Sequence, residues 1–157
     1  MSHAHLLLVD DEQQILRALR PALVAAGYEV ATAETGGEAL SHLAGEACDV
    51  VVLDLGLPDM DGKDVISRIR EWSEVPILVL SARDLEHEKI AALDQGADDF
   101  INKPFGVGEL LARIRASLRG RERRFSANAV FRSGDLHVNF ATRQVAVLGE
   151  EVRLTPR

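Results

Sequence analysis

Short apolar runs alternate with segments of helical period along the chain, and this alternation restricts the possible folds more than any other feature. The runs predict strands at residues 5–10, 28–33, 49–54, 75–81 and 98–102. The segments between and after them carry apolar residues three or four positions apart, which is typical of amphipathic helices. Strands that alternate with helices form a parallel sheet covered on both faces, with right-handed crossovers. The sequence therefore predicts an α/β fold, a doubly wound (βα)5 parallel sheet.

Capping and turn residues support the predicted helices. Thr35 and Glu38 have the spacing of a capping box. Gly27 and Gly96 stand where helices are expected to end. Pro21 falls inside the first predicted helix, where it should kink the helix or remove one of its hydrogen bonds.

The composition is that of a globular protein in a reducing compartment. Hydrophobic residues make up 46% of the 157 residues, and the apolar runs are far shorter than the roughly 20 residues that cross a bilayer. The N-terminal residues MSHAH lack the features of a signal peptide, and Cys48 has no second cysteine to pair with. We therefore expect a cytoplasmic protein that does not enter the membrane.

The net charge of −7 is unevenly distributed along the chain. Residues 1–104 hold 8 Lys and Arg against 20 Asp and Glu, for a net charge of −12, whereas residues 105–157 hold 10 against 5, for a net charge of +5. The basic part could contact nucleic acid, or it could be a solvated helix end and linker. Charge alone leaves both interpretations open.

The last part of the chain has a different pattern. Residues 122–129 are polar and lack an apolar period, which predicts a linker. Beyond the linker, short runs and turn signals predict a small antiparallel β segment over residues 130–157. Its expected strands are Val130–Arg132, Asp135–Asn139, Arg143–Val147 and Val152–Leu154.

Polar side chains close four of the predicted parallel strands. Asp10 and Asp11 follow the first strand, and Asp54, Ser81 and Lys103 stand at the ends of the third, fourth and fifth. The carboxyl ends of parallel strands meet at one edge of the sheet, where such folds bind ligands. Neighbouring carboxylates raise each other's pKa unless a cation compensates them, and a few oxygen ligands suit Mg²⁺ or Mn²⁺. A single acidic strand end is more often a solvated loop, but four matching strand ends favour a metal site.

Asp54 is the candidate reactive group because it ends a strand whose apolar run predicts burial on both faces. A carboxylate beside a metal ion can accept a phosphoryl group and become an aspartyl phosphate. Lys103 would neutralise phosphoryl oxygens, and the Ser81 hydroxyl would donate a hydrogen bond to one of them. The alternative is an enzyme, a Mg²⁺-dependent phosphatase with an Asp nucleophile. That enzyme would need an acid two positions beyond Asp54, where Gly56 stands.

These motifs resemble the receiver domain of bacterial two-component response regulators. The resemblance covers residues 4–121 and is carried by Asp10-Asp11, LDLGLPDMDG around Asp54, Ser81-Ala82 and Lys103-Pro104-Phe105. It implies a flavodoxin-like or CheY-like sheet with strand order 2-1-3-4-5. It also implies a phosphoacceptor switch rather than an enzyme, a sensor histidine kinase as phosphoryl donor, and control of transcription.

The resemblance assigns a role to each site residue. Asp54 would be the phosphoacceptor, assisted by Lys103 and Ser81. The Mg²⁺ or Mn²⁺ ligands would be Asp11, Asp54 and the carbonyl of Gly56, with Asp10 acting through water. Ser81 and Phe100 would form the switch that responds to the phosphoryl group, although Phe100 could also be an ordinary core residue.

The stretch from Ser81 to Leu118 resembles, more narrowly, the OmpR/PhoB subfamily. That resemblance implies a homodimer formed through the fourth helix, the fifth strand and the fifth helix. The implied cross-subunit ion pairs are Lys89 with Glu109, Asp99 with Arg113, and Asp98 with a basic residue near Gly120. The apolar patch between them would be Ile90, Leu93 and Ala112. The alternative is that these charges only solvate two helices.

Residues 130–157 resemble the β-rich beginning of the winged-helix DNA-binding domain of this subfamily, ending in LTPR. A winged helix reads DNA with its recognition helix in the major groove. No such helix is expected here, so we expect no DNA-binding residue in this chain. Two stretches, REWSEVPILVLSARD and GADDFINKPFGVGELLARIR, further resemble regulators of potassium-transport operons.

Overall fold

The computed structural model describes residues 3–82, 86–135, 142–145 and 152–154, with side chains up to residue 121. The chain divides into two compact units, Met1–Leu118 and Arg119–Arg157. Within the described residues, no helix is both long and apolar enough to cross a lipid bilayer.

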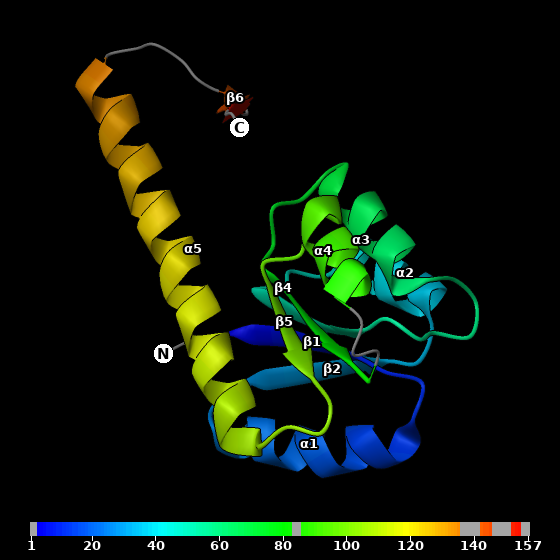
Figure 1. Ribbon diagram of the computed structural model, residues 1–157. Helices are drawn as coiled ribbons and strands as arrows, with labels where there is room; N and C mark the ends of the chain where they lie inside the picture. The colour runs from blue at the N-terminus through cyan, green and yellow to red at the C-terminus, as the bar shows by residue number, and fades with distance from the viewer. Residues whose placement is uncertain (1–2, 83–85, 136–141, 146–151, 155–157) are drawn as a thin grey trace. The chain divides into compact units, whose positions relative to one another are not determined.

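The first unit is built on a five-stranded parallel sheet. Its strands are β1 (His5–Val9), β2 (Glu29–Ala33), β3 (Val50–Asp54), β4 (Ile77–Ser81) and β5 (Asp99–Asn102). Figure 1 shows this sheet with the helices around it. All neighbouring strands are parallel and their order is β2-β1-β3-β4-β5. Each strand lies within two residues of its predicted position, so the predicted α/β fold and strand order are confirmed.

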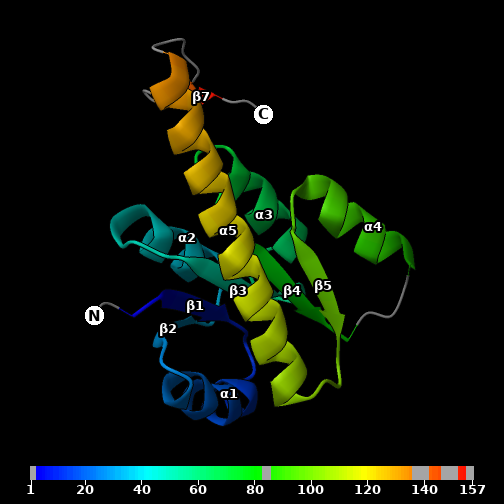
Figure 2. The same ribbon diagram turned by 90° about the vertical axis from the view of Figure 1, so that its left-hand side faces the viewer.

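Helices cover both faces of this sheet. They are α1 (Gln13–Ala25), α2 (Gly36–Gly45), α3 (Gly62–Arg70), α4 (Glu86–Gln95) and α5 (Val107–Asp135). Figure 2 shows α1 on one side of the sheet and α2 and α3 on the other. The doubly wound arrangement follows because the inner strands β1, β3 and β4 are apolar on both faces and need cover on both.

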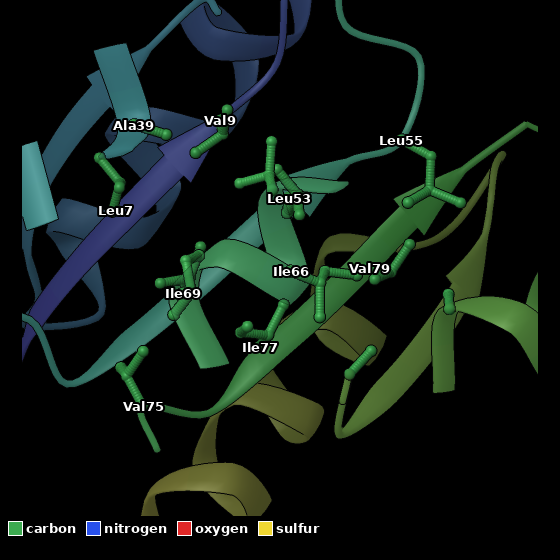
Figure 3. Packing of buried hydrophobic residues seen from close by; sticks show 14 of the residues in the cluster. Leu7, Val9, Ala39, Leu53, Leu55, Ile66, Ile69, Val75, Ile77 and Val79 are labelled. Carbon is green, nitrogen blue, oxygen red and sulfur yellow. The ribbon is translucent and has the colours of Figure 1, made fainter. Parts of the chain in front are cut away.

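Side-chain alternation along the strands divides the core into two clusters. In β1, Leu6 and Leu8 pack with the apolar residues of α1 and with Leu110 and Ile114 of α5. Leu7 and Val9 point to the other face, where they join the apolar residues of α2, α3 and α4. Figure 3 shows this second cluster, with Leu7 and Val9 near Ala39 and with Ile66, Ile69 and Ile77 side by side.

The predicted helix boundaries agree with the local geometry. The Thr35 hydroxyl accepts a hydrogen bond from the N–H of Glu38 at 3.0 Å, as in a capping box. The Glu38 carboxylate accepts from the N–H of Glu34 at 2.7 Å, one residue before the usual donor. Gly27 and Gly96 follow α1 and α4 with φ of 103° and 121°, values that favour glycine.

The helix α5 corrects the prediction for the last part of the chain. It continues to Asp135, so the linker predicted at 122–129 and the strand predicted at Val130–Arg132 are helical. The prediction took polarity as a sign of irregular structure. However, Arg, Glu and Ala favour helix, and extending a helix that packing has already nucleated adds one hydrogen bond per residue.

Two short strands form the described β structure of the second unit. β6 (Thr142–Val145) and β7 (Val152–Leu154) pair in antiparallel orientation. Of the strand predicted at Asp135–Asn139, residue 135 is helical and residues 136–139 lie outside the described part of the chain. The assignment of residues 130–157 to a winged-helix domain stays a prediction.

Candidate functional site

The ends of β1, β3 and β5 bring two carboxylates and an ammonium group together. Asp10 follows β1, Asp54 ends β3, and Lys103 follows β5. The Lys103 Nζ atom lies 3.1 Å from Asp10 Oδ2 and 3.3 Å from Asp54 Oδ1. Asp10 is 93 positions and Asp54 is 49 positions from Lys103 in the sequence, so the contact arises because the parallel strands end at the same edge of the sheet.

Asp11 completes a set of oxygen donors that fits a small divalent cation. One carboxylate oxygen from each of Asp10, Asp11 and Asp54 lies within 4.8 Å of the others. Asp10 and Asp54 are buried, whereas Asp11 is exposed, so one side of the set opens to solvent. Mg²⁺ prefers one or two carboxylates and keeps several waters, which this half-open set allows.

Asp10 differs from Asp54 in how its oxygens are used. Its Oδ1 atom accepts a hydrogen bond from the N–H of Glu12 at 2.9 Å, and its Oδ2 atom accepts from Lys103. Both oxygens of this fully buried side chain are therefore engaged within the protein. Asp10 is therefore better suited to orienting Lys103 and the Glu12 backbone than to binding a metal ion directly.

The electrostatics of the site favour an added cation. Burial raises the pKa of Asp54, and the negative charges of Asp10 and Asp11 raise it further, while Lys103 opposes the change. For Lys103, burial alone would lower the pKa, but the contacts with Asp10 and Asp54 outweigh burial and the pKa is raised. Lys103 thus stays charged, and Asp54 carries a charge that one lysine compensates only in part.

The residue two positions beyond Asp54, Gly56, lies close to the Asp54 carboxylate. A Cβ atom added to Gly56 would lie 3.7 Å from Asp54 Oδ2, in ordinary contact. A side chain at this position would therefore reach the atoms around Asp54. Because the residue is glycine, no acid or base is supplied from this position.

The two candidate switch residues lie on neighbouring strands. Ser81 ends β4 with an exposed fraction of 2%, and its carbonyl accepts from the N–H of Lys103 at 2.8 Å. Phe100, in β5, is buried in the core cluster that α2, α3 and α4 cover. This position agrees with both interpretations of Phe100, the inward-turned switch and the ordinary core residue.

The residues expected at a dimer interface lie on α4, β5 and α5, except for Asp98, which directly precedes β5. Ile90 and Leu93 are exposed on α4, as are Lys89 on the same helix and Ala112 on α5. Within the chain, Arg113 donates to both oxygens of Asp99 at 2.9 and 2.8 Å. The ion pair expected between two subunits is thus formed within one subunit here.

Sequence reasoning missed the role of Arg70 near these surfaces and gave no specific role to Glu12. Arg70 of α3 donates to Asp98 Oδ2 at 2.9 Å, and the same oxygen accepts from the N–H of Ile77 at 2.8 Å. Asp98 is therefore engaged within the subunit. Glu12, the third carboxylate of the run that closes the first strand, approaches the Lys103 ammonium at 3.7 Å.

Comparisons with known proteins agree with this geometry. The family model for the response regulator receiver domain matches residues 6–115. The chain is 47% identical to the KDP operon transcriptional regulatory protein KdpE of Escherichia coli K12, over 97% of this chain and 68% of that protein. It is 48% identical to KdpE of Mycobacterium tuberculosis H37Rv, over 96% and 67%.

Solved structures show the same fold. A CheY-like response regulator receiver domain protein from Methanospirillum hungatei has a TM-score of 0.75 at 29% identity, covering 78% of this chain and 99% of that one. A putative response regulator from Chloroflexus aurantiacus has a TM-score of 0.72 at 36% identity, covering 75% and 99%.

Proposed function

Because the chain belongs to the response regulator receiver family and is KdpE-like, we propose that it is a phosphorylation-activated regulator of transcription that accepts a phosphoryl group on Asp54. The observation that carries the proposal is the position of the Asp54 carboxylate. It is buried at the end of β3, with the Lys103 ammonium at 3.3 Å and two further carboxylates beside it. A sensor histidine kinase, which the family implies, would be the donor.

The transfer step uses groups that the site already holds. An Asp54 oxygen attacks the phosphorus of a phosphohistidine, the new O–P bond forms as the N–P bond breaks, and the electron pair leaves with the imidazole nitrogen. The Lys103 ammonium, held charged by its carboxylate neighbours, neutralises the phosphoryl oxygens. The Ser81 hydroxyl donates to one of these oxygens and transmits the change toward Phe100.

Four groups would hold a divalent cation at this site. They are Asp11, Asp54 and the carbonyl of Gly56, with Asp10 acting through water. When bound, Mg²⁺ or Mn²⁺ supplies positive charge for the incoming phosphoryl oxygens. The three neighbouring carboxylates carry negative charge that Lys103 compensates only in part, and this remaining charge would attract the ion.

The aspartyl phosphate should persist, so the protein acts as a switch rather than a phosphatase. Fast hydrolysis needs a group that activates water beside the acyl phosphate. The position that faces Asp54 Oδ2 is Gly56, which provides none.

The output would be a homodimer that controls transcription in the cytoplasm. The exposed face of Lys89, Ile90, Leu93 and Ala112, with Glu109 and Arg113, supports pairing of two α4–β5–α5 surfaces. DNA contacts would come from a winged-helix domain whose beginning is residues 130–157. The likeness to KdpE, a KDP operon regulator by its name, supports a potassium-transport operon as the target.

The test is phosphorylation by a small donor. Wild-type protein is incubated with acetyl phosphate and MgCl2, its intact mass is followed, and its oligomeric state is measured by sedimentation. We expect the mass of one phosphoryl group on the wild type and none on Asp54→Asn. Asp64→Asn, a change at an exposed carboxylate on α3, should be labelled like the wild type.

Two outcomes would overturn the proposal. The first is a wild-type protein that binds Mg²⁺ but gains no phosphoryl mass. The second is continuous release of phosphate over many cycles, which would make the protein a phosphatase.

A further inference from the structure

The loop between β3 and α3, residues 55–61, joins Asp54 to the first turn of α3 and contains Gly56. Its base is closed by a hydrogen bond from the N–H of Gly62 to the carbonyl of Leu55 at 2.9 Å, and by a β-bridge between Gly56 and Asp61. A Cβ atom on Gly62 would lie 2.7 Å from Leu55 Cα, so the two backbones touch. The two ends of the loop are thus fixed to each other.

The tip of the loop is tied to a different element, the first turn of α2. The Asp59 carboxylate accepts from the N–H of Gly36 at 2.8 Å through Oδ1 and from the N–H of Gly37 at 2.9 Å through Oδ2. The first N–H groups of a helix have no acceptor within the helix and carry its positive end. These two donors hold the pKa of Asp59 below its usual range.

Close packing accompanies these hydrogen bonds. A Cβ atom on Gly36 would lie 2.5 Å from Met60 Cγ and 2.9 Å from Val65 Cγ2, so only glycine lets the loop approach α2 this closely. Met60 and Leu57 of the loop pack against the core cluster below. The Asp59 hydrogen bonds therefore add to apolar contacts that already hold the tip of the loop against α2.

We propose that Asp59 is a positioning residue for the metal site, which holds the loop against α2 and so keeps Gly56, whose carbonyl is the proposed ligand, close to Asp54. The proposal rests on the function proposed above, in which that carbonyl is a metal ligand. Without the Asp59 carboxylate, the loop would keep its base and its apolar packing but would lose both hydrogen bonds to α2. A carbonyl that samples more positions binds a cation less tightly, because its ordering opposes binding.

The chain offers a matched control for this role. Thr35 caps the same end of α2 by accepting from the N–H of Glu38, and this hydrogen bond does not involve the loop. Thr35→Ala and Asp59→Ala should thus both weaken the start of α2. Only Asp59→Ala should loosen the loop.

The experiment is a Mn²⁺ titration of the full chain, in which the electron paramagnetic resonance signal of the free ion is measured, with urea unfolding of each variant in parallel. We expect Asp59→Ala to weaken Mn²⁺ binding by about 10-fold, the size seen when a supporting residue of a metal site is removed. Asp59→Asn, which keeps the shape and one acceptor oxygen, should give an intermediate affinity. Thr35→Ala should bind Mn²⁺ like the wild type while unfolding at lower urea.

The outcomes separate the two proposals. Wild-type affinity in Asp59→Ala would overturn the positioning role, as would an equal loss of affinity in Thr35→Ala, which would show a general effect of helix fraying. A wild-type protein that binds no Mn²⁺ would overturn the metal site of the proposed function and this inference with it. At saturating Mn²⁺, acetyl phosphate should label Asp59→Ala at the wild-type rate, because Asp59 touches no reacting atom.

Discussion

The strand-end site of Asp10, Asp11, Asp54 and Lys103, called the pocket below, and the α4–β5–α5 face both hold an ion pair between a cation and an aspartate, in different surroundings. Lys103 and Asp10 lie 3.1 Å apart with exposed side-chain fractions of 15% and 0%. Arg113 and Asp99 lie 2.8 Å apart with fractions of 40% and 32%. The distances are alike, so burial decides what each pair contributes.

In both regions one cation meets two carboxylates, but burial acts on these charges differently. In the pocket, one lysine faces two buried carboxylates, and the pKa of Asp54 is raised mainly by burial. On the face, Arg113 meets Asp99 and Glu109, and its hydrogen bonds to Asp99 raise an arginine pKa that is already far above neutral. A bound metal ion or phosphoryl group would change the electrostatic balance of the first region strongly, because its carboxylates are buried. In the second region, the arginine can only exchange one exposed carboxylate partner for another.

Removing the cation of the pocket should have the largest effect. Lys103→Met leaves Asp10 and Asp54 buried without their ammonium partner, and we expect a loss of about 3 kcal/mol in the free energy of unfolding at pH 7. The labelling rate with acetyl phosphate should fall by about 10²-fold, since a charge that stabilises the transferred group is lost. Urea unfolding and intact mass measure the two effects.

Lys89→Met is the matched control for this variant. Lys89 is exposed on α4, so its removal should change the stability of the isolated subunit by less than about 0.5 kcal/mol. Mg²⁺ should restore part of the stability of Lys103→Met and none of any loss in Lys89→Met. Equal effects of the two substitutions would mean that burial does not distinguish these regions.

Neutralising Asp54 should have a smaller effect of the opposite sign. The pKa of Asp54 is raised on folding, from the ordinary value of 3.8, so the folded state binds more protons than the unfolded state. The ionised carboxylate therefore lowers the free energy of unfolding above the raised pKa, and this loss disappears as the pH falls below the ordinary value. In metal-free buffer at pH 7, Asp54→Asn should therefore be more stable than wild type, on the order of 1 kcal/mol or roughly 4 °C in Tm.

Thermal unfolding between pH 4 and pH 7 measures this difference. We expect the advantage of Asp54→Asn to shrink as the pH falls through the raised pKa. Saturating Mg²⁺ should reverse the order of the two proteins, because an ion at 100 times its Kd adds about 2.7 kcal/mol to the protein that binds it. An Asp54→Asn protein less stable than wild type without metal would contradict the raised pKa.

Breaking an ion pair on the exposed face should have the smallest effect on the subunit. Arg113→Ala is expected to cost less than about 1 kcal/mol, and less still at high salt, because solvent and ions screen the pair. Asp99→Asn should cost a similar amount. If the face is the dimer interface, both variants should weaken dimers of the phosphorylated protein far more than they weaken the subunit, as sedimentation would show.

A loss of more than about 2 kcal/mol in subunit stability for Arg113→Ala would mean that the Arg113–Asp99 pair behaves like a buried ion pair rather than an exposed one. That result would remove the distinction between the two regions.

The polar contacts missed from the sequence share one property, a partner far away in the chain. Asp59 bonds to Gly36 and Gly37 across 23 and 22 positions, and Arg70 bonds to Asp98 across 28. No local period marks such a contact. The helix over residues 122–135 was missed for a local reason: a polar helix and a polar linker have similar compositions.

The sequence by itself determined the alternation of strands and helices and the polar residues that close the strands, because periodicity and chain order are local properties. From these, the gathering of Asp10, Asp54 and Lys103 follows once the sheet is parallel. Only the tertiary structure decided how deeply each group is buried, which direction the pKa of Asp54 takes, and which loop rests on which helix. Burial and long-range hydrogen bonds depend on how the elements pack, and packing is a property of the whole domain.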